Sequence, residues 1–299
     1  MANTLNNVNV AQIADRSLEY LGLNFFPLKA LSTDFSEDIK SEGESVSTRI
    51  PAAITAKDLS SGYSADDVSN TGVTVTLNRF RGPVFAFTDL EASKAGDVNW
   101  LKDNFIEPAM EGMMNDIFQY IFGLATAANF PNSTVITAVN MDADELADLG
   151  TELSTLKVPK SNRSAILPPG HVGGLIKDSI IEDASAFGDT NAIKEGTIMK
   201  ARGFQIHEFA SIPNNSENLL GFVCHKSAFA FAARAVADPT TIDGNAPLGV
   251  ENRVDPVTGL PIQFRAWYEP KDGKYYFSMG TLYGATKAQA NALHRIKSA

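Results

Sequence analysis

The longest helical pattern in the chain runs over residues 97–128. Its apolar residues recur at steps of three and four, at Ile106, Met110, Met113, Ile117, Ile121 and Leu124. This spacing places them on one face and predicts a helix with a single buried stripe, about 45 Å long if continuous. Pro108 lacks a backbone N–H, so we expect either a kink close to that residue or a helix that begins near Ile106.

Two shorter runs, at 46–50 and 73–77, alternate between apolar and polar residues. A period of two is the pattern of a β-strand. The segments around them are rich in Ser, Asp, Glu and Gly and therefore bury little. We predict an extended, mostly exposed two-stranded ribbon over residues 32–82. Because an isolated ribbon is marginal in water, it should pack on a partner; a flexible surface loop is the alternative.

From residue 133 to about residue 247 the two periodicities are mixed. An amphipathic helix capped by Asn140 or Asp142 is indicated by Leu146, Leu149, Leu153 and Leu156. A second helix is expected from about Gly170, and strands are predicted at 134–139, 163–167, 204–209 and 219–224. The alanine-rich residues 226–237 predict a further helix. Together these elements predict a compact α/β unit.

Strands are predicted on both sides of this unit. One lies at 83–87, before the long helix, and three follow at 250–254, 260–268 and 274–283. Short turns join the last three, which therefore form an antiparallel meander whose apolar face would cover the long helix. The first 31 residues are polar and then apolar, which indicates an arm that docks on another surface.

The composition is that of a soluble globular protein with room for about two domains: of 299 residues, 44% are hydrophobic and 20% are charged. No apolar run approaches the roughly 18 residues that span a bilayer, and the polar start lacks a secretion signal, so we expect a cytosolic product without membrane contact. The formal net charge of -10 disfavours a nucleic-acid reader that works by neutralising phosphates.

No catalytic, cofactor or metal site is predicted from the sequence. The histidines stand singly, without the paired spacing of metal ligands, at His171, His207, His225 and His294. The glycine-rich residues 170–174 lack the Lys-Ser/Thr ending of a phosphate loop, and no GxSxG motif is present. Cys224 is the only cysteine, and its apolar neighbours indicate an inert core residue rather than a catalytic thiol.

The order of these parts resembles that of a known family, and local strings agree with it. Residues 42–46 and 71–77 resemble the strands of an extended loop, residues 106–109 resemble the entry to a spine helix, and residues 194–196, 203–204 and 213 resemble the pattern of an inserted domain. The chain is thus similar, over most of its length, to the major capsid proteins of tailed bacteriophages with the Hong Kong 97 fold. The branch it resembles most is the coat protein of short-tailed phages.

This resemblance implies an α+β Hong Kong 97-type capsid fold with four parts. They are an N-terminal arm (1–31), an extended β-hairpin loop (32–82), a peripheral domain with an antiparallel sheet and the long spine helix (83–132 and 248–299), and an inserted α/β axial domain (133–247). Contacts between subunits would involve the extended loop and its base, with the candidates Lys40, Glu42, Arg49, Lys57, Asp66, Asp67 and Arg79. No cross-link is predicted.

The implied function is a major capsid protein that assembles, as hexamers and pentamers, into the icosahedral shell around phage double-stranded DNA. The expected partners are a separate scaffolding protein, a portal, and packaged DNA without sequence-specific contacts. The protein would be found in the virion after assembly in the host cytoplasm. Two alternatives remain open: an encapsulin-like nanocompartment shell, and an α/β hydrolase or binding protein built on residues 133–247.

Overall fold

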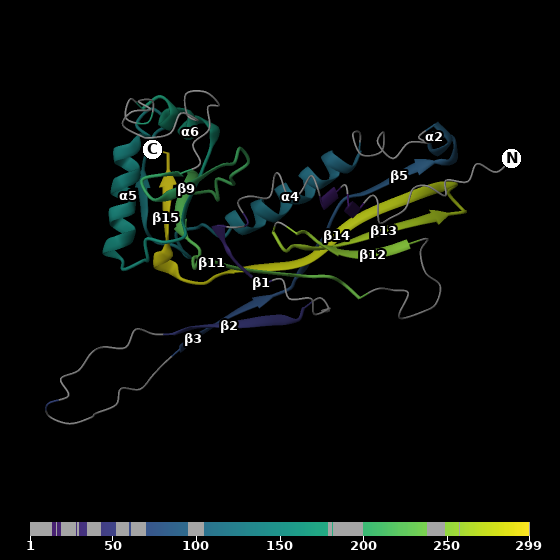
Figure 1. Cartoon of the computed structure of the whole chain (residues 1–299), viewed down its shortest axis with the longest axis horizontal. Helices are drawn as coiled ribbons and strands as arrows, with labels where there is room; N and C mark the ends of the chain where they lie inside the picture. Colours follow the sequence, from purple (N-terminus) through teal and green to yellow (C-terminus); the bar gives the residue numbers. More distant parts are fainter. Residues whose placement is uncertain are drawn as a thin grey trace.

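Two β-sheets, a long helix and a projecting ribbon make up the computed structural model of the chain (Figure 1). The structure describes residues 14–15, 17–18, 28, 30–34, 43–51, 60, 70–94, 105–178, 181, 200–237, 249–256 and 258–298. The six-stranded sheet and its helices form one end of the body. The seven-stranded sheet and helix α4 (Glu107–Phe122) form the rest.

The seven-stranded sheet is organised around one long strand, β14 (Lys274–Lys287). The first half of β14 pairs with β13 and β5, and the second half pairs with β11 and β4. The other strands are β1 (Ser32–Asp34), β4 (Arg79–Arg81), β5 (Val84–Thr88), β11 (Phe229–Arg234), β12 (Gly249–Val254) and β13 (Pro261–Glu269). The short helix α2 (Asp89–Lys94) follows β5. Strands β12, β13 and β14 confirm the predicted antiparallel meander.

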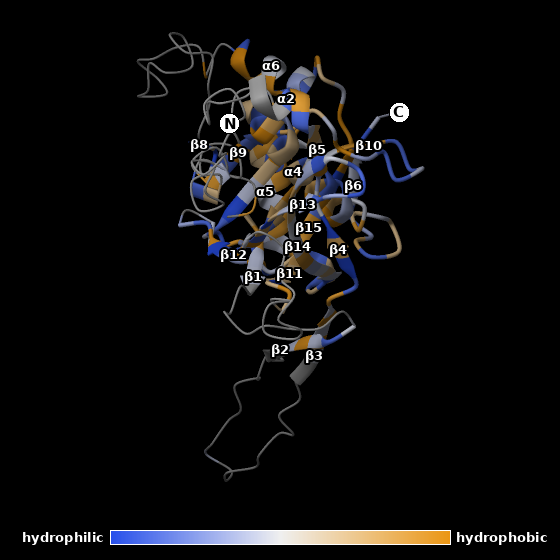
Figure 2. Ribbon diagram, turned by 90° about the vertical axis from the view of Figure 1, so that its right-hand side faces the viewer, coloured by the Kyte–Doolittle hydropathy of each residue, from blue (hydrophilic) through white to orange (hydrophobic). Residues whose placement is uncertain are grey.

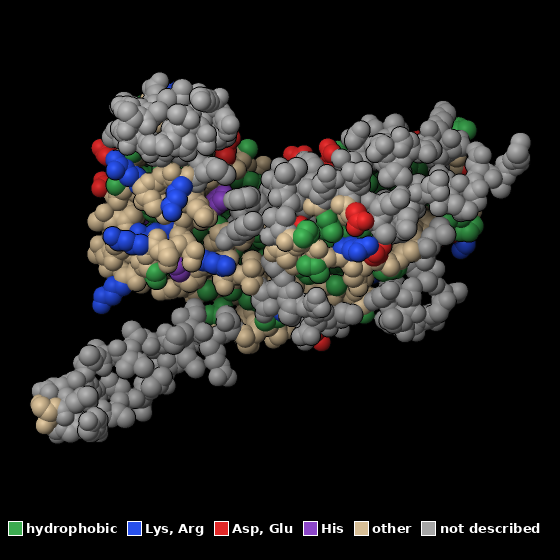
Figure 3. All heavy atoms as spheres, viewed as in Figure 1, with side chains coloured by type: hydrophobic (Ala, Val, Ile, Leu, Met, Phe, Trp, Pro, Cys, Tyr) green, Lys and Arg blue, Asp and Glu red, His purple; other side chains and the backbone are tan. Residues whose placement is uncertain are grey.

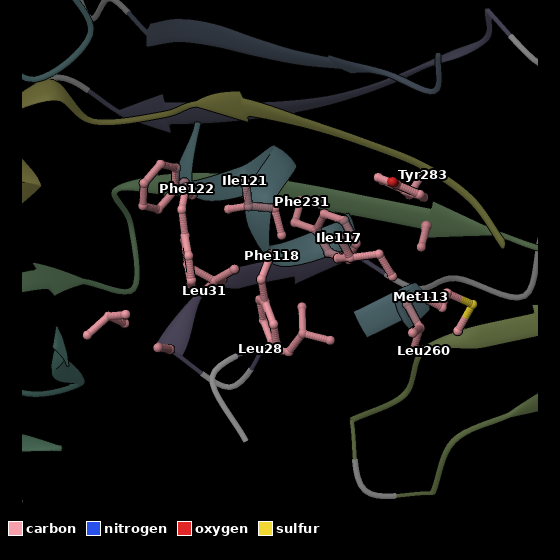
Figure 4. Packing of buried hydrophobic residues seen from close by; sticks show 14 of the residues in the cluster. Leu28, Leu31, Met113, Ile117, Phe118, Ile121, Phe122, Phe231, Leu260 and Tyr283 are labelled. Carbon is pink, nitrogen blue, oxygen red and sulfur yellow. The ribbon is translucent and has the colours of Figure 1, made fainter. Parts of the chain in front are cut away.

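Helix α4 carries the predicted apolar stripe, and its other buried residues include Phe118 and Phe122. Leu28 and Leu31 from the N-terminal segment, Phe231 from β11 and Tyr283 from β14 surround the helix (Figure 4). Pro108 lies in the first turn of α4, where its missing N–H has no helical partner to lose. Phe105 and Ile106 form a π-helical turn directly before α4, so the choice between a helix start and a kink stays a prediction.

The predicted helix is too long at its C-terminal end. Gly123 caps α4, and residues 124–128 form turns. The amide of Asn215 donates to the carbonyl oxygens of Phe122 and Ala125, at 3.0 and 3.1 Å, and so satisfies the end of the helix from a distant loop. With 16 residues the helix is about 24 Å long. Residues 97–104 lie outside the described part of the chain.

The six-stranded sheet has the order β6-β15-β10-β7-β9-β8. Its strands are β6 (Ser133–Val135), β7 (Arg163–Leu167), β8 (Lys200–Ala201), β9 (Phe204–Glu208), β10 (Leu219–His225) and β15 (Leu293–Lys297). Helices α5 (Ala143–Thr155) and α6 (Pro169–Ile176) pack with it through a shared core. The amphipathic helix is confirmed, and Asp142 caps it by accepting a hydrogen bond from the Glu145 N–H at 2.8 Å.

The predicted alanine-rich helix is wrong, because residues 229–234 form strand β11. Phenylalanine and alanine alternate there: Phe229 and Phe231 join the core around α4, while Ala230 and Ala232 face the base of the ribbon. All six residues of the strand are buried. The pattern therefore has the period of two of a strand buried on both faces.

The ribbon consists of β2 (Ser45–Pro51) and β3 (Asn70–Thr76), which pair antiparallel in register. It projects from the body, beyond the hydrophobic interior (Figure 2). Its base is less exposed than predicted, because Val73, Val75 and Leu77 are buried. The division of the chain into domains stays a prediction. Strand pairing places β11, from the predicted axial domain, in the seven-stranded sheet, and it places β15, from the predicted peripheral domain, in the six-stranded sheet.

Candidate assembly surface

The ribbon root, residues 76–81, lies directly on β14. Leu77 exchanges backbone hydrogen bonds with Gly43 and Glu44, at 2.7 and 2.9 Å, and these close the ribbon at its base. The carbonyl oxygen of Thr76 lies only 2.0 Å from the position that a Cβ on Gly284 would occupy. Only glycine allows the root to pass this close to β14.

Arg79 and Asn78 connect the root to helix α4 through Tyr120. The Arg79 guanidinium lies over the Tyr120 ring, 4.1 Å from its centroid, as in a cation–π interaction. The Tyr120 hydroxyl donates a hydrogen bond to Asn78 Oδ1 at 3.2 Å. The direction in which the ribbon leaves the body is therefore coupled to the position of α4.

A second link joins α4 to β14. The buried Tyr283 hydroxyl donates to Asp116 Oδ2. Burial and this hydrogen bond raise the pKa of Tyr283 far above its ordinary value. Arg81 Nη1 lies 3.8 Å from Asp116 Oδ1, but both side chains are substantially exposed, so this ion pair contributes little stability.

An apolar groove opens beside the root, between α4 and the turn that joins β4 to β5. Its volume is about 600 Å³. Apolar side chains line most of it, including Phe80, Val84, Met113 and Met279, and Phe80 and Val84 are 45% and 60% exposed. An exposed apolar surface of this kind is typical of a site that another protein segment covers.

Of the seven contact residues proposed from the sequence, only two fall within the described residues. Arg79 contacts Tyr120 of its own chain, and Arg49 lies in β2 opposite Gly72. The remaining five lie outside the described part: Lys40, Glu42, Lys57, Asp66 and Asp67. All seven stay predictions as contacts between subunits.

The sequence reasoning missed the partners of the root, namely Asp116, Tyr120 and Tyr283. Asn78 and Tyr120 are 42 positions apart in the chain. Asp116 and Tyr283 are 167 positions apart. No local periodicity joins residues at such distances, so only the tertiary fold identifies these contacts. Asp116 and Tyr120 are one helical turn apart on α4, which would have marked a common face but not its partner.

Within the described residues, no group of three or more His, Cys, Asp or Glu side chains is placed to hold a metal ion. Cys224 is buried, which confirms the predicted core position, and burial raises the pKa of its thiol to about 12. No helix in the described ranges has the length and apolar character that crossing a membrane requires.

One constellation bears on the hydrolase alternative. His294 lies between Thr134 and Glu152, with Nε2 2.8 Å from Thr134 Oγ1 and Nδ1 2.8 Å from Glu152 Oε2. This is the linear order of nucleophile, base and acid. Burial lowers the pKa of His294, although the Glu152 carboxylate opposes the shift. None of the three side chains lines the groove beside α4, the recess next to α5 (Ala147 to Gly203) or the recess next to α6 (Ala138 to Asp178). The three side chains link β6, β15 and α5 to one another.

No protein-family model matches the sequence, and no curated protein matches it. Solved structures do match the fold. A structure of Mycobacterium phage Che8 shares 17% identity over 85% of each chain, with a TM-score of 0.57. The capsid of cyanophage P-SCSP1u shares 12% identity over 90% of this chain and 86% of that one, with a TM-score of 0.60.

A virus-like particle from Pyrococcus furiosus also matches, with 13% identity over 96% of this chain and 98% of that one and a TM-score of 0.58. The matched structures thus cover nearly the whole chain, and the predicted α+β class is confirmed. The chain therefore has the Hong Kong 97-type fold of phage major capsid proteins.

Proposed function

We propose that the protein is the major subunit of an icosahedral shell, in which hexamers and pentamers enclose phage double-stranded DNA. The observation that carries this proposal is the ribbon, which projects from the body and is supported by its own chain at the root (Figure 1). Because a two-stranded ribbon is marginal in water, a neighbouring subunit that covers it would stabilise it. The shared fold with a phage capsid supports the same role.

A shell also explains the other features of the chain. Many copies of one interface close a lattice, so a single subunit carries surfaces that only its neighbours bury, such as the groove beside α4. The net charge of -10 is compatible with DNA that is enclosed without sequence-specific contacts. A separate scaffolding protein and a portal would complete assembly in the host cytoplasm, and the virion would be the final location. The role is structural, with no catalytic activity.

A compartment that encloses protein rather than DNA is a second candidate. The match to the Pyrococcus furiosus particle raises this candidate, because that structure shares the fold over 96% of this chain and is described as virus-like rather than as a phage capsid. The contents of purified native particles separate the two functions. Nuclease-protected DNA supports the phage capsid, and a packaged protein without DNA supports the compartment.

The ribbon provides the sharpest test of shell assembly. Deletion of residues 36–82, which the sequence alone suggests, would also remove β4 and the buried Leu77 and would therefore damage the core. Thr48 and Val73 face each other in the β2–β3 register. Replacing residues 49–72 with Asn-Gly should close a two-residue hairpin and keep the root intact.

We expect this shortened protein to unfold at the same denaturant concentration as the wild type but to form no shells in electron micrographs. The wild type, alone or with a scaffold, should form closed shells or regular hexamers and pentamers. Normal shells from the shortened protein would contradict the proposed role of the ribbon. A wild type that stays monomeric with every scaffold tried would contradict the shell function itself.

A further inference from the structure

One end of the six-stranded sheet concentrates positive charge. Arg163 begins β7, and it faces Phe204 at the start of β9 and His225 at the end of β10. The turns next to these strand ends therefore meet at the same edge. They carry the exposed cations Lys157, Lys160, Arg202 and Lys226. Lysine and arginine side chains gather on the visible face of this unit (Figure 3).

A recess of about 390 Å³ opens at this end, between one face of α5 and the turns. Lys160, Arg163 and Arg202 line it, and none of its lining residues is an Asp or Glu. In a chain with a net charge of -10, a recess lined by three cations and no carboxylate is a local reversal of sign.

Arg163 lies at the buried side of the recess and is 5% exposed. Its guanidinium donates hydrogen bonds to the carbonyl oxygens of Gly150, Val158 and Pro159, at 2.7 to 2.9 Å, and to Ser154 Oγ at 3.1 Å. These acceptors are neutral, so they satisfy N–H groups without balancing the charge, and burial lowers the pKa of Arg163. Nη1 keeps a second N–H that none of these four contacts uses.

The cations at the mouth of the recess, Lys160 and Arg202, are exposed to solvent. Arg202 lies 3.5 Å from Asp144, but the two side chains are 42% and 80% exposed, and a pair this open holds Arg202 only weakly. A ligand with several negative oxygens would offer Arg202 a stronger, charge-assisted partner than one exposed carboxylate.

We propose that this recess binds a phosphate-class oxyanion. The anion would sit between Lys160 and Arg202, with Arg163 supplying positive charge from below. A multiply charged oxyanion provides the balancing charge that the neutral acceptors of Arg163 lack, and its oxygens suit the planar donors of arginine. The proposal does not depend on shell assembly, and it concerns a site outside the ribbon root.

Calorimetric titration of the unassembled protein with inorganic pyrophosphate tests this site. We expect saturable binding that weakens as salt is raised. Lys160→Ala and Arg202→Ala should each weaken it about tenfold, because each removes a charge-assisted contact. Both side chains are exposed, so both variants should fold. Lys177→Ala is the matched control: Lys177 is also exposed but lies at the end of α6, beside a different recess.

The absence of saturable binding, or an equal loss of binding in the Lys177 variant, would overturn the proposal. A short DNA duplex of random sequence, added as a competitor, identifies the source of the phosphate. Displacement of pyrophosphate by the duplex would mean that the site takes nucleic-acid phosphodiesters. Pyrophosphate binding that the duplex leaves unchanged would mean that the site takes a free phosphate.

Discussion

Gly284 lets the ribbon root rest on β14 without a side chain between them. In Gly284→Ala the new Cβ would meet the Thr76 carbonyl oxygen at 2.0 Å, so the root must shift. We expect this substitution to destabilise the fold by roughly 1–3 kcal/mol and to weaken assembly, because a displaced root redirects the ribbon. Denaturant unfolding and electron microscopy measure the two effects.

Gly112→Ala is the control, since a Cβ at Gly112 would have no atom within 4 Å. It lies within α4, where alanine should instead stabilise the helix by about 0.5–1 kcal/mol. Equal stabilisation of both alanine variants would show that the root does not approach Gly284 of β14 as closely as the structure indicates.

Cys224 should make stability depend on alkaline pH. Its pKa is raised from 9.0 to about 12 by burial, so the fold favours the neutral thiol. The contribution is complete below pH 9, the unfolded value, and is lost as pH rises towards 12. We expect the difference in unfolding free energy between the wild type and Cys224→Ala to shrink over this range.

The same burial should protect Cys224 from an aromatic disulfide reagent at neutral pH until the protein is unfolded with denaturant. Rapid labelling of the native protein would show that the thiol is accessible and would remove the basis for the pH dependence.

Helix α5 depends on its N-cap residue, Asp142, which directly precedes the helix. Asp142 accepts the hydrogen bond from the Glu145 N–H at 2.8 Å and thereby satisfies one of the free donors at the helix start. We expect Asp142→Ala to lower the free energy of unfolding by about 1 kcal/mol. Asp148→Ala, an exposed acidic position within the same helix, is the control and should change it by less than about 0.5 kcal/mol. Equal effects would mean that charge, not capping, matters.

Elements were predicted best where one local rule decides them. The leucine spacing and cap of α5, the period of two in β2 and β3, and the apolar stripe of α4 all depend on neighbours within a few residues. The end of α4 and the strand β11 were predicted wrongly. The Asn215 amide, from a distant loop, satisfies carbonyl oxygens at the end of α4, and the alanines of β11 pack against the base of the ribbon.

At the scale of the whole molecule, two of the links by which the chain passes between the two sheets run side by side. One follows β10 and the other follows β14, and they are joined by hydrogen bonds from Ala288 N–H to the Ala228 carbonyl at 2.8 Å and from Gln289 N–H to the Ser227 carbonyl at 3.1 Å. The second link leads to β15, which lies inside the six-stranded sheet, next to the edge strand β6 and between it and β10.

The last strand should therefore be essential although it lies at a chain end, where residues are often dispensable. Truncation after Ala292 removes the buried Leu293 and Ile296 and the ion pair of Arg295 with Glu217. We expect the truncated protein to be insoluble or to lose cooperative unfolding. Circular dichroism and limited proteolysis measure these changes. Truncation after Lys297 keeps β15 and should leave both unchanged. A stable, cooperative protein without β15 would show that the six-stranded sheet does not depend on this interior strand.

The sequence by itself determined the local elements, the ribbon and the order of parts that led to the fold class, because periodicity and capping act over a few residues. It also led to Arg79 as a charged residue at the ribbon base. The tertiary structure alone decided that Arg79 meets Tyr120, that β15 joins the six-stranded sheet, and that three cations line one recess. These contacts join residues far apart in the chain, and only packing brings them together.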